Sequence, residues 1–130
     1  MNEIKEKYLK LGKINNEDAT NLKECLSSLS KEGLDELYNL YDVFEVNKKT
    51  KQAKINYLYN EIPGQFLDDW INMMDKEKRL KLIKIINYKQ IDIDQDIIHF
   101  ISFGYVYITP SNKLIVPNTL YYFLENLYKK

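Results

Sequence analysis

The segment from Asp94 to Leu127 constrains the fold of this chain most, because cap and turn residues mark each of its boundaries. Asp94 can cap the start of a helix, and Gly104 can close its end. Two short runs rich in β-branched and aromatic residues follow, separated by a turn of Pro, Ser and Asn. Pro117 suits the first turn of a last helix. The segment therefore predicts a helix, strands over residues 105–109 and 113–116, and a further helix.

Elsewhere in the chain, apolar residues recur every three or four positions, which is the period of an amphipathic helix. Ser30, Thr50 and Asp75 suit helix starts, and Pro63-Gly64 interrupts the pattern. We therefore expect a mainly α, compact helical bundle with a two-stranded β-hairpin near the C-terminus. The predicted helices cover residues 2–11, 21–29, 31–41, 51–62, 65–74 and 76–87, with an extended connector over residues 43–49.

The apolar stripes of two of these helices predict which side chains face the core. For the helix over residues 51–62 the stripe consists of Ile55, Leu58, Tyr59 and Ile62. For the helix over residues 76–87 it consists of Leu80, Leu82, Ile83 and Ile86.

Charge is balanced over the chain but unevenly distributed along it. Nineteen basic residues match nineteen acidic ones, so no net field attracts the protein to nucleic acid or membrane. Residues 1–45 carry six Lys against ten acids, or −4, and residues 46–89 carry ten basic residues against five acids, or +5. Residues 90–130 carry three Lys against four acids, or −1. A mildly basic middle therefore follows an acidic start.

Cysteine usage and hydropathy indicate where the protein resides. A lone cysteine, Cys25, excludes an internal disulfide and a multi-cysteine zinc site, and suits a reducing compartment. The sequence has neither a signal-peptide core nor an apolar run of membrane-span length. We therefore expect a cytoplasmic protein. Arg79 is the sole arginine among abundant Lys, Asn, Ile and Tyr, which is typical of AT-rich coding in a bacterium, plasmid or phage.

Residues with catalytic or metal-binding chemistry are few. His99 lies within an apolar run, where a packed histidine is favoured over a general base, and Cys25 lies on an apolar stripe that suits the core. Asp92, Asp94 and Asp96 alternate as in calcium loops, but the turn glycine and terminal glutamate are missing, so helix capping is favoured. We predict a non-enzymatic protein with no catalytic residue, metal ligand or cofactor.

Residues 29–62 resemble the SAP-like helix–extended–helix motif, in which a leucine-bearing helix, an extended link and a Lys-rich helix start follow one another. Leu34, Leu37, Lys51 and Leu58 stand where that motif uses such residues. The glycine that the motif has before its second helix is replaced here by polar residues. The resemblance implies association with DNA.

Residues 65–127 resemble a winged helix, with three helices, a hairpin and an extra helix. The winged-helix element that normally enters the major groove corresponds to residues 95–103, which contain no Lys or Arg and begin among three aspartates. Sequence-specific DNA recognition in the usual winged-helix manner is therefore not expected. Together the resemblances divide the chain into residues 1–62 and 65–130, either as two closely packed regions or as one compact domain.

Two candidate binding surfaces remain. The lysines Lys48, Lys49, Lys51 and Lys54 cluster at one predicted helix start and could contact DNA phosphates, with an affinity that falls as salt rises. Tyr57 beside them could stack on bases. A solvated, Lys-rich helix start explains the same cluster equally well. We rank association with DNA first, because both resemblances imply it, and leave the oligomeric state open.

A protein partner is the alternative. The chain has eleven tyrosines, and aromatic residues are enriched in protein interfaces. Tyr105 and Tyr107 alternate on one predicted strand and so share one sheet face, while Tyr121 lies off the apolar stripe of the last helix. Filling the edge of the core is the commoner explanation for such tyrosines. The alternative hypothesis is an adaptor or inhibitor, encoded by a phage or plasmid, that binds through these three residues.

Overall fold

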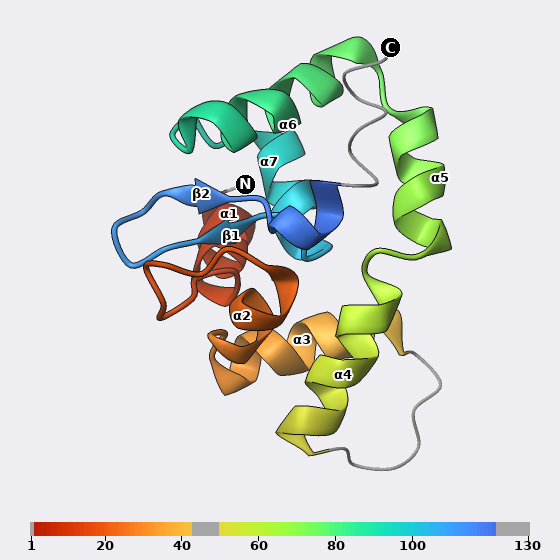
Figure 1. The fold of residues 1–130 in the computed structure, drawn as a ribbon. Helices are drawn as coiled ribbons and strands as arrows, with labels where there is room; N and C mark the ends of the chain where they lie inside the picture. Colours follow the sequence, from red (N-terminus) through yellow and green to blue (C-terminus); the bar gives the residue numbers. More distant parts are fainter. Residues whose placement is uncertain (1, 43–49, 122–130) are drawn as a thin grey trace.

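The computed structural model describes residues 2–42 and 50–121. Within those ranges the chain forms seven α-helices, a two-stranded antiparallel sheet and a short 3-10 helix (Figure 1). The predicted fold class, mainly helical with a hairpin near the C-terminus, is confirmed. The elements are α1 (Asn2–Leu11), α2 (Leu22–Ser27), α3 (Lys31–Tyr41), α4 (Lys51–Glu61), α5 (Gln65–Met73), α6 (Lys76–Tyr88), α7 (Gln95–Ser102), β1 (Tyr107–Ile108), β2 (Leu114–Ile115) and η1 (Asn118–Leu120).

Helix boundaries follow the predicted caps. The side chains of Ser30, Thr50, Asp75 and Asp94 each accept a hydrogen bond from the backbone N–H three residues later, which satisfies one of the free donors of the first turn. Gly104 follows α7 with a φ of 82°. The predicted connector over residues 43–49, and the predicted last helix beyond residue 121, lie outside the described residues.

The hairpin is shorter than predicted, and a third segment lies beside it. β1 pairs with β2 in the register Tyr107↔Ile115 and Ile108↔Leu114. On the other edge of β1, the Ile14 N–H donates to the Ile108 carbonyl over 2.8 Å, and the Ile108 N–H donates to the Gly12 carbonyl over 3.0 Å. The linker after α1 therefore covers this edge of β1, which would otherwise be unpaired.

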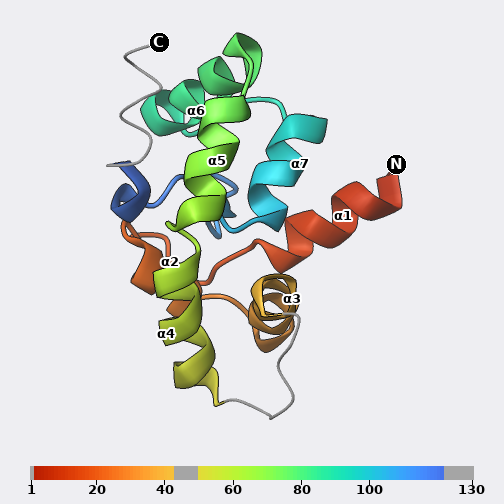
Figure 2. The ribbon, with the colours of Figure 1, turned by 90° about the vertical axis from the view of Figure 1, so that its right-hand side faces the viewer.

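A hydrophobic core contains residues from both predicted regions of the chain. It extends from Leu22 and Leu26 in α2, through Leu58 in α4, to Phe100 in α7 and Leu120 in η1, all at 0% exposure. α1 contacts both α3 and α7, and it lies between them in Figure 2. The N-terminal helix thus meets helices from either half of the sequence.

Some predicted core positions are on the surface instead. Tyr59 is 39% exposed and Leu80 is 46% exposed, although both stand on the predicted stripes. In α6 the predicted residues Leu82, Ile83 and Ile86 do pack on the core, joined by Ile85, which is fully buried. The prediction that Tyr59 and Leu80 face the core is wrong.

Candidate binding cleft

The described members of the lysine cluster differ in their surroundings. Lys51 is exposed in the first turn of α4, whereas Lys54 is partly buried, with its Nζ 2.6 Å from Asp35 Oδ1 and 5.6 Å from the centre of the Tyr38 ring. Lys54 therefore ties α4 to α3, and Asp35 balances its charge. Lys48 and Lys49 lie outside the described residues.

Lys51 and Lys54 share a small hollow with a further lysine, Lys31, from the start of α3. The hollow has a volume of about 220 Å³, and Leu34 and Asp35 complete its lining. Tyr57 is not placed as a free stacking surface, because its ring packs edge-on against Tyr38 with centroids 5.4 Å apart. The structure thus brings three lysines together, but with a carboxylate among them.

The predicted tyrosine surface needs correction. Tyr105 is 2% exposed and Tyr107 is 1% exposed, so neither can contact a partner while this fold is intact. Val106 and Ile108, on the opposite face of the strand, are buried as well. The alternation of side chains along the strand therefore does not separate a buried face from a solvated one. Tyr121 is 41% exposed and lines a shallow hollow beside β2. That Tyr121 contacts a protein partner stays a prediction.

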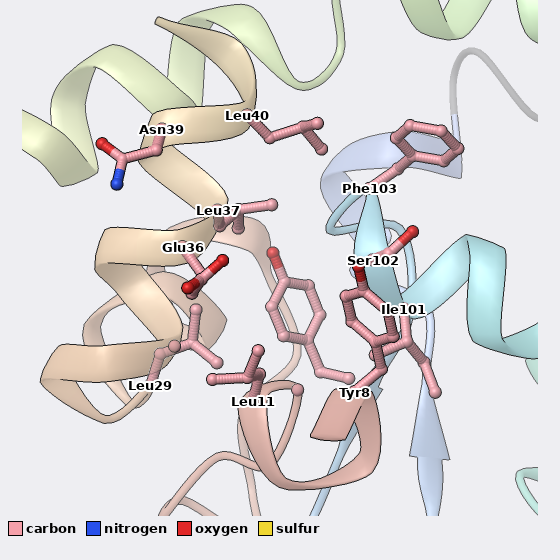
Figure 3. Close-up of a pocket in the computed structure, with 13 residues that line it drawn as sticks. Tyr8, Leu11, Leu29, Glu36, Leu37, Asn39, Leu40, Ile101, Ser102 and Phe103 are labelled. Carbon is pink, nitrogen blue, oxygen red and sulfur yellow. The ribbon is translucent and has the colours of Figure 1, made fainter. Parts of the chain in front are cut away.

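A larger hollow lies between α1, α3 and the C-terminal end of α7, with a volume of about 420 Å³. We call it the α1/α3/α7 cleft. Figure 3 shows Leu37 and Leu40 of α3 on one side of the opening, and Tyr8 of α1 with Ile101 and Phe103 on the other. The lining residues are Tyr8, Leu11, Gly12, Leu29, Gly33, Glu36, Leu37, Asn39, Leu40, Ile101, Ser102, Phe103 and Tyr107.

Two glycines let the three walls approach one another. A Cβ at Gly33 would lie 2.4 Å from the Leu11 carbonyl oxygen, and a Cβ at Gly12 would lie 2.5 Å from Ile101 Cγ2. Both distances are far below van der Waals contact, so any larger residue would push the end of α1 away from α3 or α7. The position of α1 against its neighbours, and with it the shape of the cleft, depends on these two residues.

The mouth of the cleft combines apolar surface with few polar groups. Leu40 is 46% exposed at this mouth, and Glu36 and Asn39 are exposed beside it on α3. Among the described residues that line the cleft, Glu36 alone carries a charge. An exposed leucine above an apolar hollow is the arrangement in which a partner's side chain can remove the most apolar area from water.

Phe103, which lines the cleft, belongs to an aromatic cluster around Trp70. The ring centroids of Trp70 and Phe103 are 5.4 Å apart, and those of Trp70 and Phe100 are also 5.4 Å apart. The Tyr41 hydroxyl donates to the Phe103 carbonyl over 2.6 Å. Because Trp70 is the sole tryptophan of the chain and touches a lining residue, its fluorescence should report on occupation of the cleft.

A buried hydroxyl belongs to another residue that lines the cleft. Tyr107 Oη has no hydrogen-bond partner among the described residues, and burial raises the pKa of Tyr107 well above its ordinary value. A buried polar group without a partner costs free energy. The hydroxyl of Tyr107 therefore destabilises the fold next to the cleft.

The residues considered for metal binding and catalysis have other surroundings. Lys81 Nζ lies 2.7 Å from Asp94 Oδ2 and 2.6 Å from Asp96 Oδ2, which ties α6 to the start of α7. Within residues 2–42 and 50–121, no group of three or more His, Cys, Asp or Glu side chains is placed to hold a metal ion. No helix in these ranges is long and apolar enough to cross a membrane.

The two predicted core residues with reactive side chains have different outcomes. Cys25 is confirmed as a core residue at 0% exposure, and burial raises the pKa of its thiol to about 12. His99 is exposed on α7, so the prediction of a packed histidine is wrong. Its Nε2 lies 3.3 Å from Gln95 Nε2, one turn earlier on the same helix.

Comparisons with protein-family models, with curated proteins and with solved structures give no match to this chain. The resemblances to a SAP-like motif and to a winged helix therefore stay expectations from the sequence. Sequence reasoning did not find the α1/α3/α7 cleft. The available signals were Leu40, which lies off the apolar stripe of its helix, and glycines directly after one helix and in the first turn of another.

Proposed function

We propose that the chain is a non-enzymatic protein-binding module whose α1/α3/α7 cleft accepts an apolar side chain of a partner protein. The observation that carries the proposal is the 46% exposed Leu40 at the mouth of an apolar hollow of about 420 Å³. Covering a leucine of this kind and filling the hollow would contribute roughly 1.5–3 kcal/mol per buried side chain. Such an anchor in a pocket is the usual centre of a protein interface.

The charge at the cleft supports a protein partner over a nucleic acid there. Glu36 is the charged residue of the lining, and a phosphate brought to this mouth would meet a carboxylate. An apolar side chain with a neighbouring Lys or Arg has no such penalty. The partner segment is therefore expected to carry an aliphatic or aromatic anchor beside a basic residue.

A peptide selection tests this function directly. Peptides from a displayed random library would be selected on the intact protein, and binding of each recovered peptide would be followed by Trp70 fluorescence. The test variant is Leu40→Glu, and the matched control is Tyr59→Glu, because Tyr59 is a similarly exposed apolar residue on α4 and is absent from the lining of the cleft.

We expect recovered peptides to bind Leu40→Glu roughly tenfold or more weakly than wild type, and to bind Tyr59→Glu unchanged. Recovery of no peptide, or peptides that bind both variants as well as wild type, would contradict the proposal.

DNA association is the second candidate function, favoured by one observation. Lys31 and Lys51 are exposed and share a hollow with Lys54, so a phosphate there would meet more than one ammonium group. Labelled duplex and single-stranded DNA would be titrated over rising salt, with Lys51→Glu against wild type. A steep loss of affinity with salt, and a weaker Lys51→Glu variant, would support this candidate, and absence of binding at low salt would remove it.

A further inference from the structure

The outer face of α6 presents a row of alternating basic and apolar residues. Lys76, Leu80, Lys84 and Tyr88 follow one another at four-residue steps, and all four are exposed, Leu80 at 46% and Tyr88 at 71%. Residues four apart lie on the same side of a helix, so these side chains form one row about 18 Å long. We call it the α6 row. Glu77 borders it, 4.0 Å from Lys81 Nζ.

The charges of the α6 row are opposite to those at the mouth of the α1/α3/α7 cleft. Glu36 and, one turn earlier on α3, Glu32 are both exposed. In the described part of the chain, the ion pairs involve neither these two glutamates nor Lys76 and Lys84. By contrast, Lys54 and Lys81 are already paired with aspartates inside the molecule. The basic groups of the row, Glu36 of the cleft lining and Glu32 beside it on α3 are thus all available for a partner.

The two surfaces cannot meet within one molecule. Figures 1 and 2 both place α6 at one end of the molecule and α3 at the other. A contact between the α6 row and the cleft therefore requires two molecules. The chain also has no net charge, so long-range repulsion between copies is small.

We propose that the partner of the α1/α3/α7 cleft is a second copy of this chain, with Leu80 of one copy in the cleft of the next. Lys76 and Lys84 then flank the anchor and face Glu32 and Glu36. The inference rests on the proposed function, because it names the protein whose side chain the cleft accepts. A helix that offers an apolar residue with flanking charges to an apolar groove is a common mode of recognition.

The proposed contact is head-to-tail, because the row and the cleft are different surfaces. Each copy that uses its row still has an unoccupied cleft, so assembly continues beyond a dimer unless a ring closes. A mixture of two variants tests this geometry, because a head-to-tail contact and a symmetric dimer predict different results for it. The variants are Leu40→Glu, which blocks the cleft, and Leu80→Glu, which blocks the row.

Molar mass would be measured by sedimentation equilibrium over a wide concentration range, with folding checked by circular dichroism. Both residues are exposed, so both variants are expected to fold. We expect the wild type to gain mass with concentration and each variant alone to stay monomeric. An equal mixture of the two should form a dimer and nothing larger, because one intact cleft can meet one intact row. Tyr59→Glu should behave as wild type.

Three results would overturn the proposal: a wild type that stays monomeric, variants that associate as wild type does, or a mixture that stays monomeric. None of these would by itself remove the proposed function, which depends on Leu40-dependent binding of peptides. If such peptides bind while the wild type is monomeric, the cleft serves a different protein. If neither occurs, both proposals fail.

A charge exchange tests the orientation of the contact. Glu36→Lys placed in the Leu80→Glu copy should weaken the mixed dimer severalfold. Lys84→Glu added to the Leu40→Glu copy should restore part of that loss. If Lys84→Glu does not restore affinity, Lys84 and Glu36 do not face each other as proposed.

Discussion

The two sides of α7 carry similar apolar and aromatic residues, but one side is closed and the other is open. On the side of the hairpin, Phe100, Tyr105 and Val106 are at most 2% exposed, and residues 12–14 and β2 cover both edges of β1. On the side of α1 and α3, the hollow stays open, with Leu40 at its mouth. The difference lies in what covers each side: on the hairpin side, Trp70 of α5 packs against Phe100 and Tyr105. The closed side supplies stability, and the open side supplies a surface for another molecule.

The largest effect should come from opening the closed side. Phe100→Ala removes a ring with 0% exposure that packs against Trp70, so we expect a loss of about 4 kcal/mol in the free energy of unfolding. Phe103→Ala is the matched variant on the open side, and its partly exposed ring should cost less than half as much. Urea unfolding measures both. Equal losses would contradict the distinction between the two sides.

A smaller loss should follow from pushing the walls of the cleft apart. Gly33→Ala places a methyl group 2.4 Å from the Leu11 carbonyl oxygen, so α1 and α3 must separate, at about 2 kcal/mol. Lys31→Ala, at an exposed position in the same turn, is the control and should be nearly neutral. Thermal unfolding compares the two variants. A neutral Gly33→Ala would show that this close approach does not hold the walls in place.

Removing the buried hydroxyl should raise stability. Tyr107→Phe eliminates a buried oxygen without a described hydrogen-bond partner, and we expect a gain of about 1 kcal/mol. Tyr38→Phe provides the contrast, because the Tyr38 hydroxyl donates to Asp42 Oδ2 over 2.5 Å, and its removal should cost about 1 kcal/mol. If both variants lose stability equally in urea, the Tyr107 hydroxyl has a partner in solution.

The smallest effect should be the pH dependence of the clamp between α6 and α7. Burial by itself raises the pKa of Asp94, but hydrogen bonds from Lys81 and the Ile97 N–H outweigh it and hold that pKa below its usual value. The pKa of Asp94 is lower in the folded state than in the unfolded state. Ionised Asp94 therefore stabilises the fold above its unfolded-state pKa, and this stabilisation is lost as the pH falls through its folded-state pKa.

Asp94→Asn isolates this charge, because asparagine can still cap α7. We expect the variant to be less stable than wild type in urea at neutral pH, and the gap to close in acid. A gap of constant size from neutral to acidic pH would show that the charge of Asp94 does not contribute.

Local signals in the sequence predicted the helices, whereas surfaces formed by distant segments could not be predicted. The caps Ser30, Thr50 and Asp94 were correct, because each acts on a backbone N–H three residues away. Tyr105 and Tyr107 were placed on the surface because alternation assumes a sheet with one solvated face. The ring of Trp70, from α5, packs against Tyr105 with centroids 5.7 Å apart, and nothing in the sequence of the hairpin shows that contact.

Contacts between distant segments also determine the charge environment of Lys54 and the shape of the cleft. Lys54 was expected to be available for phosphate, but its partner Asp35 lies 19 residues earlier and meets it through the contact of α3 with α4. The cleft depends on the approach of α1 to α3 and α7, at Gly33 and Gly12. Glycine at these positions is compatible with many structures, so its role became visible only with the neighbouring helices in place.

Methyl-labelled NMR of the protein, titrated with a peptide selected on it, tests whether the open side of α7 binds protein. We expect the methyl signals of Leu37, Leu40 and Ile101 to shift with increasing peptide, while those of Leu34 in the lysine hollow and Leu114 beside Tyr121 stay in place. Shifts at Leu34 or Leu114, with the cleft methyl groups unchanged, would contradict binding at the open side of α7.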